Sequence, residues 1–414
     1  MVDPSASPVP SVRQRGRALR LLVLLTASVG LSIRPPVPQA DGHPSVPAGV
    51  ADHLVAGRKA RRAGAYEEAE RHLREYQRWN GLTPALRLEW AMMQAQRGDL
   101  SEERYLRSSI RRGHADALFI LEALAQGYMY SYRLTEAKDC LDRLLECEPQ
   151  NIQALHWRAW VAEQRPHRAW GPMPGDDALP DYRRALKVAP DDFQARLRVA
   201  QILVQRPASK DDVHEGLEHL RRLRQSQPNN PALFYELAQY HLTQGDPDKA
   251  EEVLDKLLAM QPRHAPALVA RARLALNEDR DTEAEGWLRQ ALAVDPYQRE
   301  AYYRLAMCVR ERDRGEAMFY LRQLERLNED ENRLNELKCK IIQSPHDPAL
   351  RHEAGVIALR LGKEDEGLRW LDSALQDDPG HRPTHLALAR YYKRTNRPDL
   401  AGRHRRLAQR PGKP

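Results

Sequence analysis

Cysteine and phenylalanine are scarce in this sequence, with four of each among 414 residues. No Cys-x-x-Cys pair occurs, so the cysteines predict neither a zinc site nor a disulfide-rich scaffold. Cys140 and Cys147 lie on one predicted helix about 10 Å apart along its axis, which is too far for a disulfide. A Cys308–Cys339 disulfide stays open in an oxidising compartment. Because phenylalanine is rare while leucine and alanine abound, the composition favours helices over sheets.

Motifs of the common enzyme classes are also absent. The sequence has no phosphate-binding GxxxxGK[ST], no GxGxxG after a strand and no GxSxG. His352-Glu353 does not begin a zinc-protease motif, because Val356 stands where the second histidine would be. We therefore predict a protein that is not an enzyme and has no cofactor, metal or small-molecule substrate. A role as the non-catalytic subunit of an enzyme, with catalysis supplied by another chain, stays open.

What the sequence does contain is an internal repeat. Residues 231–262 and 265–296 align with a shift of 34 residues, so that Leu254 matches Leu288 and Pro262 matches Pro296. A fixed period of this length is typical of stacked helical hairpins. Because one hairpin cannot bury its own apolar face, neighbouring hairpins must stack on each other.

One repeat shows how each hairpin forms. Phe234, Leu237 and Ala238 recur at the spacing of one helix face, which predicts a first helix. The Gly245-Asp246-Pro247 turn then breaks that helix and starts a second one. Small residues, Ala238 in the first helix and Ala250 in the second, allow the two helices to approach closely.

These positions resemble the tetratricopeptide repeat, with its small residue at position 8, alanine at 20 and proline at 32. The resemblance implies an all-α fold, a right-handed superhelix of about nine to ten helical hairpins. It also implies a concave face that binds peptides or partner proteins. We expect an array over 50–327, a phase-breaking helix over 328–347 and two further units with a basic end over 348–411. The units of the array are expected near 50–80, 84–113, 118–149, 152–190, 193–228, 231–262, 265–296 and 299–327.

The N-terminal segment has the pattern of a secretory signal. Four arginines precede an apolar stretch over residues 21–33, which is shorter than the roughly 20 residues that a membrane span needs. We therefore expect residues 1–40 to be a signal peptide or signal anchor, followed by a Pro/Gly linker over 41–49. The protein would then be exported, to the periplasm or the exterior, or anchored to a membrane; a cytoplasmic location is the alternative. Cleavage of the leader is left open.

Charge is concentrated at the two ends of the chain. Of the net charge of +7, residues 1–40 carry +4 and residues 390–414 carry +8, which leaves −5 for the body. The basic end could meet anionic lipid or nucleic acid, but few aromatic residues accompany it, so nucleic acid is a minor option. A solvated capping helix explains the same charges.

The resemblance also implies which residues line the concave groove. Mixed aromatic, amide and guanidinium groups suit an extended peptide. One subtype of this family, the carboxylate clamp, requires lysine and asparagine at set positions of the first helix. Tyr235 and Val269 stand where that lysine would be, so the sequence does not match this subtype. Trp170, in an insertion over 165–176, could be an exposed docking loop or could fold back onto its own hairpin. The predicted groove residues are Leu197, Gln201, Tyr235, Gln239, Val269, Arg273, Tyr303, Met307 and Arg310.

The sequence therefore predicts a non-enzymatic scaffold that is exported or membrane-tethered and binds protein or peptide partners on its concave face. The alternative is a cytoplasmic regulatory protein whose basic C-terminal helix contacts nucleic acid or an acidic partner. The partner and the oligomeric state are left open.

Overall fold

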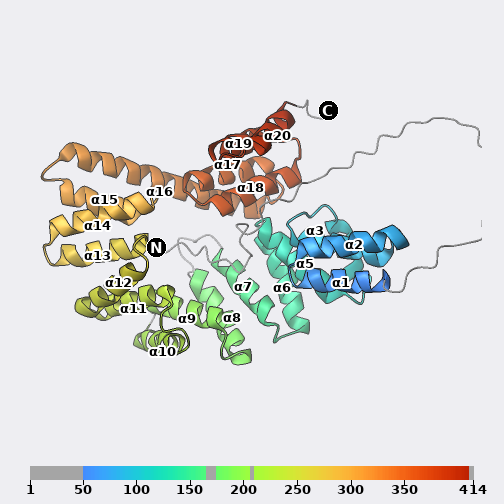
Figure 1. The fold of residues 1–414 in the computed structure, drawn as a ribbon, viewed down its shortest axis with the longest axis horizontal. Coiled ribbons are helices and arrows are strands. Elements are labelled where there is room, and N and C mark those ends of the chain that lie inside the picture. Colours follow the sequence, from blue (N-terminus) through green and yellow to red (C-terminus); the bar gives the residue numbers. More distant parts are fainter. Residues whose placement is uncertain (1–49, 165–173, 206–208, 410–414) are drawn as a thin grey trace, which may run out of the picture.

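A computed structural model describes residues 50–164, 174–205 and 209–409. Over these ranges the chain forms twenty α-helices and no strand, and consecutive helices pair as ten antiparallel hairpins (Figure 1). The all-α prediction and the expected nine or ten hairpins are confirmed. The helices are α1 (Val50–Arg62), α2 (Tyr66–Asn80), α3 (Pro84–Gln96), α4 (Glu103–Arg111), α5 (Ala117–Tyr130), α6 (Leu134–Cys147), α7 (Ile152–Glu163), α8 (Pro174–Val188), α9 (Phe193–Gln205), α10 (Lys210–Ser226), α11 (Pro231–Gln244), α12 (Pro247–Met260), α13 (Ala265–Asn277), α14 (Asp281–Val294), α15 (Arg299–Val309), α16 (Arg314–Gln343), α17 (Pro348–Arg360), α18 (Glu364–Asp377), α19 (Arg382–Arg394) and α20 (Pro398–Ala408).

Local sequence explains where the helices of a hairpin begin and end. The side chain of Asn230 caps α11 by accepting a hydrogen bond from Ala232 N at 3.1 Å. Gly245 ends α11 with φ 74°, a left-handed conformation that glycine adopts without steric cost. The small residues Ala238 and Ala250 are fully buried between α11 and α12, as their size requires.

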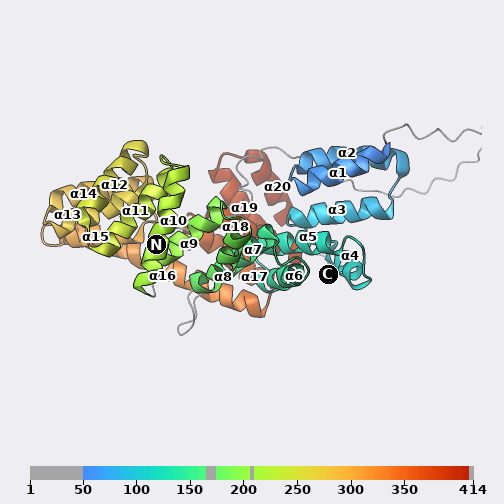
Figure 2. The same cartoon turned by 90° about the horizontal axis from the view of Figure 1, so that it is seen from below.

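The ten hairpins do not form a straight rod. In Figure 1 the array runs from α1–α3 through the hairpins of α5 to α10, turns at α13–α15, and returns along α16. Figure 2 shows from a second side that α17–α20 lie next to the hairpins of α3 to α6. The chain therefore curls until its C-terminal hairpins meet its N-terminal third, and we call this meeting the ring closure.

The boundary expected at residue 327 falls inside a helix. The structure has one continuous helix, α16, of 30 residues, which includes both the second helix of the eighth hairpin and the expected phase-breaking helix. No glycine or proline stands between Gly315 and Pro345, so nothing interrupts the helix. At about 1.5 Å per residue it is about 45 Å long. Its second half carries the chain away from the eighth hairpin toward the ring closure.

The hydrophobic core follows this course. One cluster of buried residues joins the hairpins from α11 to α16, with Leu254, Leu288 and Leu305 at its centre. A larger cluster runs from α3 to α9 and also contains Leu334 and Leu337 of α16 and Trp370 of α18. Residues more than 200 positions apart thus share one core, so that the ring closure is packed with apolar side chains as well as polar ones.

The predicted leader and linker, residues 1–49, lie outside the described residues. Among the described residues no helix is long and apolar enough to cross a membrane. All four cysteines are free thiols, so the disulfide left open between Cys308 and Cys339 is not formed in this structure.

Candidate partner-binding face and the ring closure

The predicted groove residues come from the first helices of four successive hairpins, α9, α11, α13 and α15, except Arg310, which directly follows α15. Three of them lie close together across two neighbouring hairpins. Tyr235 interacts with the side chain of Gln239 one turn later in α11 and lies within electrostatic range of Arg273 of α13. Burial, followed by the nearby Glu236 carboxylate, raises the pKa of Tyr235, while Arg273 lowers it. These three residues form a half-buried aromatic, amide and guanidinium group.

A polar ladder crosses three hairpins beside this group. The Arg198 guanidinium lies 2.7 Å from the Glu163 carboxylate of α7 and donates to Gln201 Oε1 at 2.7 Å. Gln201 Nε2 in turn donates to Glu236 Oε1 of α11 at 3.1 Å. The ladder therefore links α7, α9 and α11 through side chains, so these hairpins are held in register by more than apolar packing.

Glu236 is the unusual member of the ladder. Its side chain is buried, and within the described residues it accepts hydrogen bonds only from the amides of Gln201 and Gln205, the latter at 3.3 Å. No cation lies in hydrogen-bond contact with it among the described residues, and burial raises the pKa of Glu236. A buried carboxylate without a cationic partner is costly to keep ionised.

The remaining predicted groove residues are spread along the array. Val269 is only 4 % exposed and packs in the core with its α13 neighbours, so its assignment to the groove surface is wrong; its side chain points into the hairpin. Leu197 is half-buried against the cluster around Leu220, and Met307 is half-buried on α15. Tyr303 is 53 % exposed, and Arg310 donates to its neighbour Glu311 at 3.0 Å. Of these residues Tyr303 and Arg310 are exposed, and together these residues do not form one compact site.

Two further expectations concern chemistry and the insertion. Trp170 lies outside the described residues. Within them no group of three or more His, Cys, Asp or Glu residues could hold a metal ion.

A hollow of about 180 Å³ lies between α10, α11 and α12. Phe234, Leu237 and His241 are among the residues that line it, and none of the predicted groove residues borders it.

The ring closure is a second structured site, and it is built on Arg351. This side chain is fully buried in α17 and donates from Nη1 to the Ser131 carbonyl oxygen of the α5–α6 turn at 2.6 Å. The same nitrogen donates to Ser373 Oγ at 2.6 Å, and Nε lies 3.2 Å from Asp377. Burial lowers the pKa of Arg351 to about 10, against the attraction of Asp377, so the guanidinium stays charged at neutral pH.

Aromatic and charged groups complete the closure. The ring of Tyr132 lies 4.3 Å from that of Trp370, centroid to centroid, and Tyr132 adopts φ 56°, a conformation that side chains rarely adopt. Beside them Lys338 of α16 forms an ion pair of 2.8 Å with Glu366 of α18. Although burial alone would raise it, the charges of Lys338 and Lys363 lower the pKa of Glu366 to about 2. The closure thus combines ring packing with charges that are paired.

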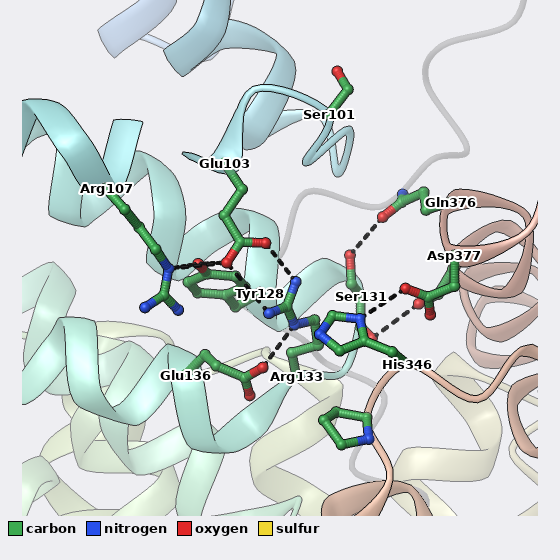
Figure 3. Close-up of polar contacts among 12 residues, drawn as sticks. Ser101, Glu103, Arg107, Tyr128, Ser131, Arg133, Glu136, His346, Gln376 and Asp377 are labelled. Atoms are coloured by element: carbon green, nitrogen blue, oxygen red, sulfur yellow. Dashed lines mark hydrogen bonds and ion pairs between the residues drawn. The ribbon is translucent and has the colours of Figure 1, made fainter. Parts of the chain in front are cut away.

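Figure 3 shows a second polar network beside the closure, on the α4–α6 side. Glu103 accepts from Tyr128 Oη at 2.7 Å, from Arg107 Nε at 2.9 Å and from Arg133 Nη1 at 2.7 Å. Arg133 also reaches Glu136 at 2.7 Å. Although burial opposes it, the hydrogen bonds from Arg133 and Tyr128 lower the pKa of Glu103. This network fixes the turn that presents Ser131 and Tyr132 to the C-terminal hairpins.

Sequence reasoning missed both the ladder and the closure. The ladder had a signal in the sequence: its charged residues Arg198, Glu163 and Glu236 stand on helices whose inward faces are otherwise apolar. Charged residues at such positions indicate a polar network between helices. The closure had a weaker signal. At the end of α5, Ser131-Tyr132 stands where other first helices end in glycine, as α11 ends at Gly245. Nothing in the sequence, however, connects this turn with residues 240 positions later.

Two family models match the chain. One describes the middle tetratricopeptide-like domain of cilia and flagella-associated protein 70 and matches residues 215–328. The other describes the tetratricopeptide repeat and matches residues 175–231. No functionally characterised protein sequence matches the chain significantly.

The chain is also similar, at low identity and low TM-score, to several solved structures. A tetratricopeptide repeat protein from Parabacteroides merdae is 20 % identical, with a TM-score of 0.41, over 63 % of this chain and 99 % of its own. PilF of Pseudomonas aeruginosa is 18 % identical, with a TM-score of 0.30, over 51 % of this chain and 88 % of its own. The human IFIT1 dimer, solved with m7Gppp-AAAA, is 16 % identical, with a TM-score of 0.39, over 87 % of this chain and 89 % of its own.

Ten stacked helical hairpins and two family models of the same type define the class as an α-helical repeat solenoid. The chain is a tetratricopeptide-repeat protein, as its repeat spacing predicted.

Proposed function

We propose that this protein is a non-enzymatic scaffold that binds a protein or peptide partner along the first helices of its central hairpins. The observation that carries the proposal is the group formed by Tyr235, Gln239 and Arg273 across two hairpins. Arg273 has no carboxylate partner among the described residues, so its guanidinium is available to a carboxylate or carbonyl of a partner. Tyrosine and arginine are also the residue types that contribute most to protein interfaces.

The surrounding structure supports a rigid surface. The ladder from Glu163 to Glu236 ties α7, α9 and α11 together, and the ring closure restrains both ends of the array. A surface that is ordered before binding loses less conformational entropy when the partner binds. The central hairpins therefore suit a partner that binds in an extended form along several helices.

The test compares captured partners among three immobilised forms of the full chain. The first is the wild type, the second carries Arg273→Glu and Tyr303→Ala, and the third is a control with Arg263→Glu and Trp79→Ala, exposed residues outside the predicted groove. We expect at least one protein to be retained by the wild type and the control and lost by the second form. If every retained protein binds the second form equally well, the central hairpins are not the binding surface.

We also propose that residues 1–40 direct the protein for export or tether it to a membrane, so that partners meet it outside the cytoplasm. The support is the arginine-rich start followed by the apolar stretch over residues 21–33. Fusion of residues 1–49 to a reporter that is active only after export tests this. An active reporter is the expected result, and an intact, inactive cytoplasmic fusion would contradict it.

A further inference from the structure

The last hairpin carries a row of exposed cations along α19. Arg382, Arg390, Lys393 and Arg394 are all exposed, and at 100° per residue they fall within about one third of the helix circumference. Leu386 lies within the same sector and is 36 % exposed. We call these five residues the α19 stripe.

None of the four cations has a carboxylate partner within the described part of the chain. By contrast, Arg333 of α16 pairs with Glu353, and Arg360 of α17 pairs with Asp330. Arg394 makes one contact of another kind, lying over the ring of Tyr391 at 5.8 Å. The α19 stripe is therefore a cationic surface whose charge the described fold does not neutralise.

The rest of the hairpin strengthens this field. Between residues 382 and 408 there are eight Lys and Arg residues, and Asp399 is the one acidic residue. Two acidic residues lie beside α19: Glu364 of α18 accepts a hydrogen bond from Tyr391 Oη at 3.3 Å, and Asp378 before the helix accepts one from Gly380 N at 2.9 Å. Concentrated charge of one sign attracts anionic partners and speeds their association. Arginine in particular can bind a carboxylate through two parallel hydrogen bonds.

The aromatic residues of the hairpin argue against single-stranded nucleic acid. Proteins that bind such strands stack bases on exposed rings. Here Tyr391 is 9 % exposed, and Tyr392 is stacked on His404 with ring centroids 5.6 Å apart. Tyr391 is thus buried with Arg394 over its ring, and one face of Tyr392 is covered by His404. A bilayer would need several apolar side chains to insert, whereas the α19 stripe exposes only Leu386.

We propose that the α19 stripe binds an extended acidic segment of a partner protein. Carboxylates of the segment pair with the arginines and the lysine, and one apolar side chain of the segment packs on Leu386. From residue 382 to residue 394 the stripe is about 18 Å long. At about 3.3 Å per residue, an extended segment of about six residues covers it. This surface lies outside the central hairpins and does not depend on their proposed function.

The test measures binding of a fluorescent peptide, Glu-Glu-Glu-Leu-Glu-Glu-Glu, to the full-length protein by anisotropy at 50 mM and 200 mM NaCl. The stripe variant carries Arg390→Gln, Lys393→Gln and Arg394→Gln. The matched control carries Arg221→Gln, Arg224→Gln and Arg263→Gln, three exposed cations without an ion pair among the described residues. Thermal melting of all forms checks that they remain folded.

We expect the stripe variant to bind the peptide at least about tenfold more weakly than the wild type at 50 mM NaCl, and the control to change by less than about twofold. The difference should shrink at 200 mM NaCl, because salt screens exposed charges. Equal losses in the stripe variant and the control overturn the proposal, because binding would then follow total charge. Stripe-dependent binding of a seven-nucleotide RNA or of phosphatidylserine vesicles that is tighter than that of the peptide also overturns it, and would assign the surface to that ligand.

Discussion

Removing the Tyr132 ring should open the ring closure without unfolding the hairpins. Tyr132 is 6 % exposed, its ring packs on Trp370, and its hydroxyl donates to the Gln164 carbonyl oxygen at 3.1 Å. Truncating a buried aromatic side chain to alanine costs about 3–5 kcal/mol. Each 1.4 kcal/mol is a tenfold change in an equilibrium, so Tyr132→Ala weakens closure by a factor of roughly 10² to 4 × 10³.

The positive φ of Tyr132 provides an internal comparison. Alanine retains the steric penalty of this conformation, whereas glycine removes about 1–2 kcal/mol of it. Tyr132→Gly should therefore disturb the closure less than Tyr132→Ala, although both lack the ring. The expected order of closure is wild type, then glycine, then alanine.

Small-angle X-ray scattering and circular dichroism together read the outcome. We expect Tyr132→Ala to raise the radius of gyration and maximum dimension while the helical signal stays near that of the wild type. Tyr303→Ala, an exposed tyrosine of α15, is the control and should change neither. An unchanged scattering curve for Tyr132→Ala, or a loss of helix that matches the change in size, would refute the reasoning that a separable closure joins the two ends.

Two further predictions concern titrating groups. Burial raises the pKa of Glu236, so the folded state binds its proton more tightly than the unfolded state and loses stability as pH rises through the folded pKa. Glu236→Gln should therefore raise the melting temperature by about 1–2 °C at pH 8, corresponding to about 1 kcal/mol, and change it little at pH 4. A lower melting temperature at pH 8 would contradict this. Burial lowers the pKa of His404, the charges of His385 and Arg403 lower it further, and together they bring this pKa to about 4. Between pH 6.5 and pH 4 the unfolded state therefore binds more protons than the folded state, and the stability of the fold decreases as the pH falls through that window. Urea unfolding of the wild type at pH 7 and pH 5 should show this loss, and His404→Gln should reduce it; an equal loss in the variant would assign the pH dependence to other groups.

Local features of the fold were predictable because each hairpin is specified by residues close in sequence. Gly245, Pro247 and the buried alanines at positions 238 and 250 define one hairpin, and the period of 34 predicts the next. The continuous α16 could also have been inferred, since no helix-breaking residue separates residue 315 from residue 345. The repeat pattern led instead to a boundary at 327, because periodicity marks units and not the ends of helices.

Long-range features were not predictable from the same patterns. The closure depends on how small rotations between ten hairpins add up, and no single residue determines that sum. Arg351 looks like an ordinary helix residue in the sequence, yet its guanidinium reaches a carbonyl oxygen 220 positions away. On the candidate face, the positions within each repeat correctly predicted that Tyr235, Gln239 and Arg273 lie near one another. The same reasoning also assigned Val269 to this face, although its side chain is buried in the core.

The distance between the two sides of the closure can be measured with the protein's own cysteines. Cys147 at the end of α6 and Cys339 in the second half of α16 are exposed, while Cys140 is buried and Cys308 can be replaced by serine. Spin labels on Cys147 and Cys339 report by pulsed electron paramagnetic resonance whether the two sides stay together. A closed ring predicts a single narrow distance distribution that matches the structure. In Tyr132→Ala the distribution should become broader and shift to longer distances. A broad, long distribution in the unmutated closure would contradict the closed ring.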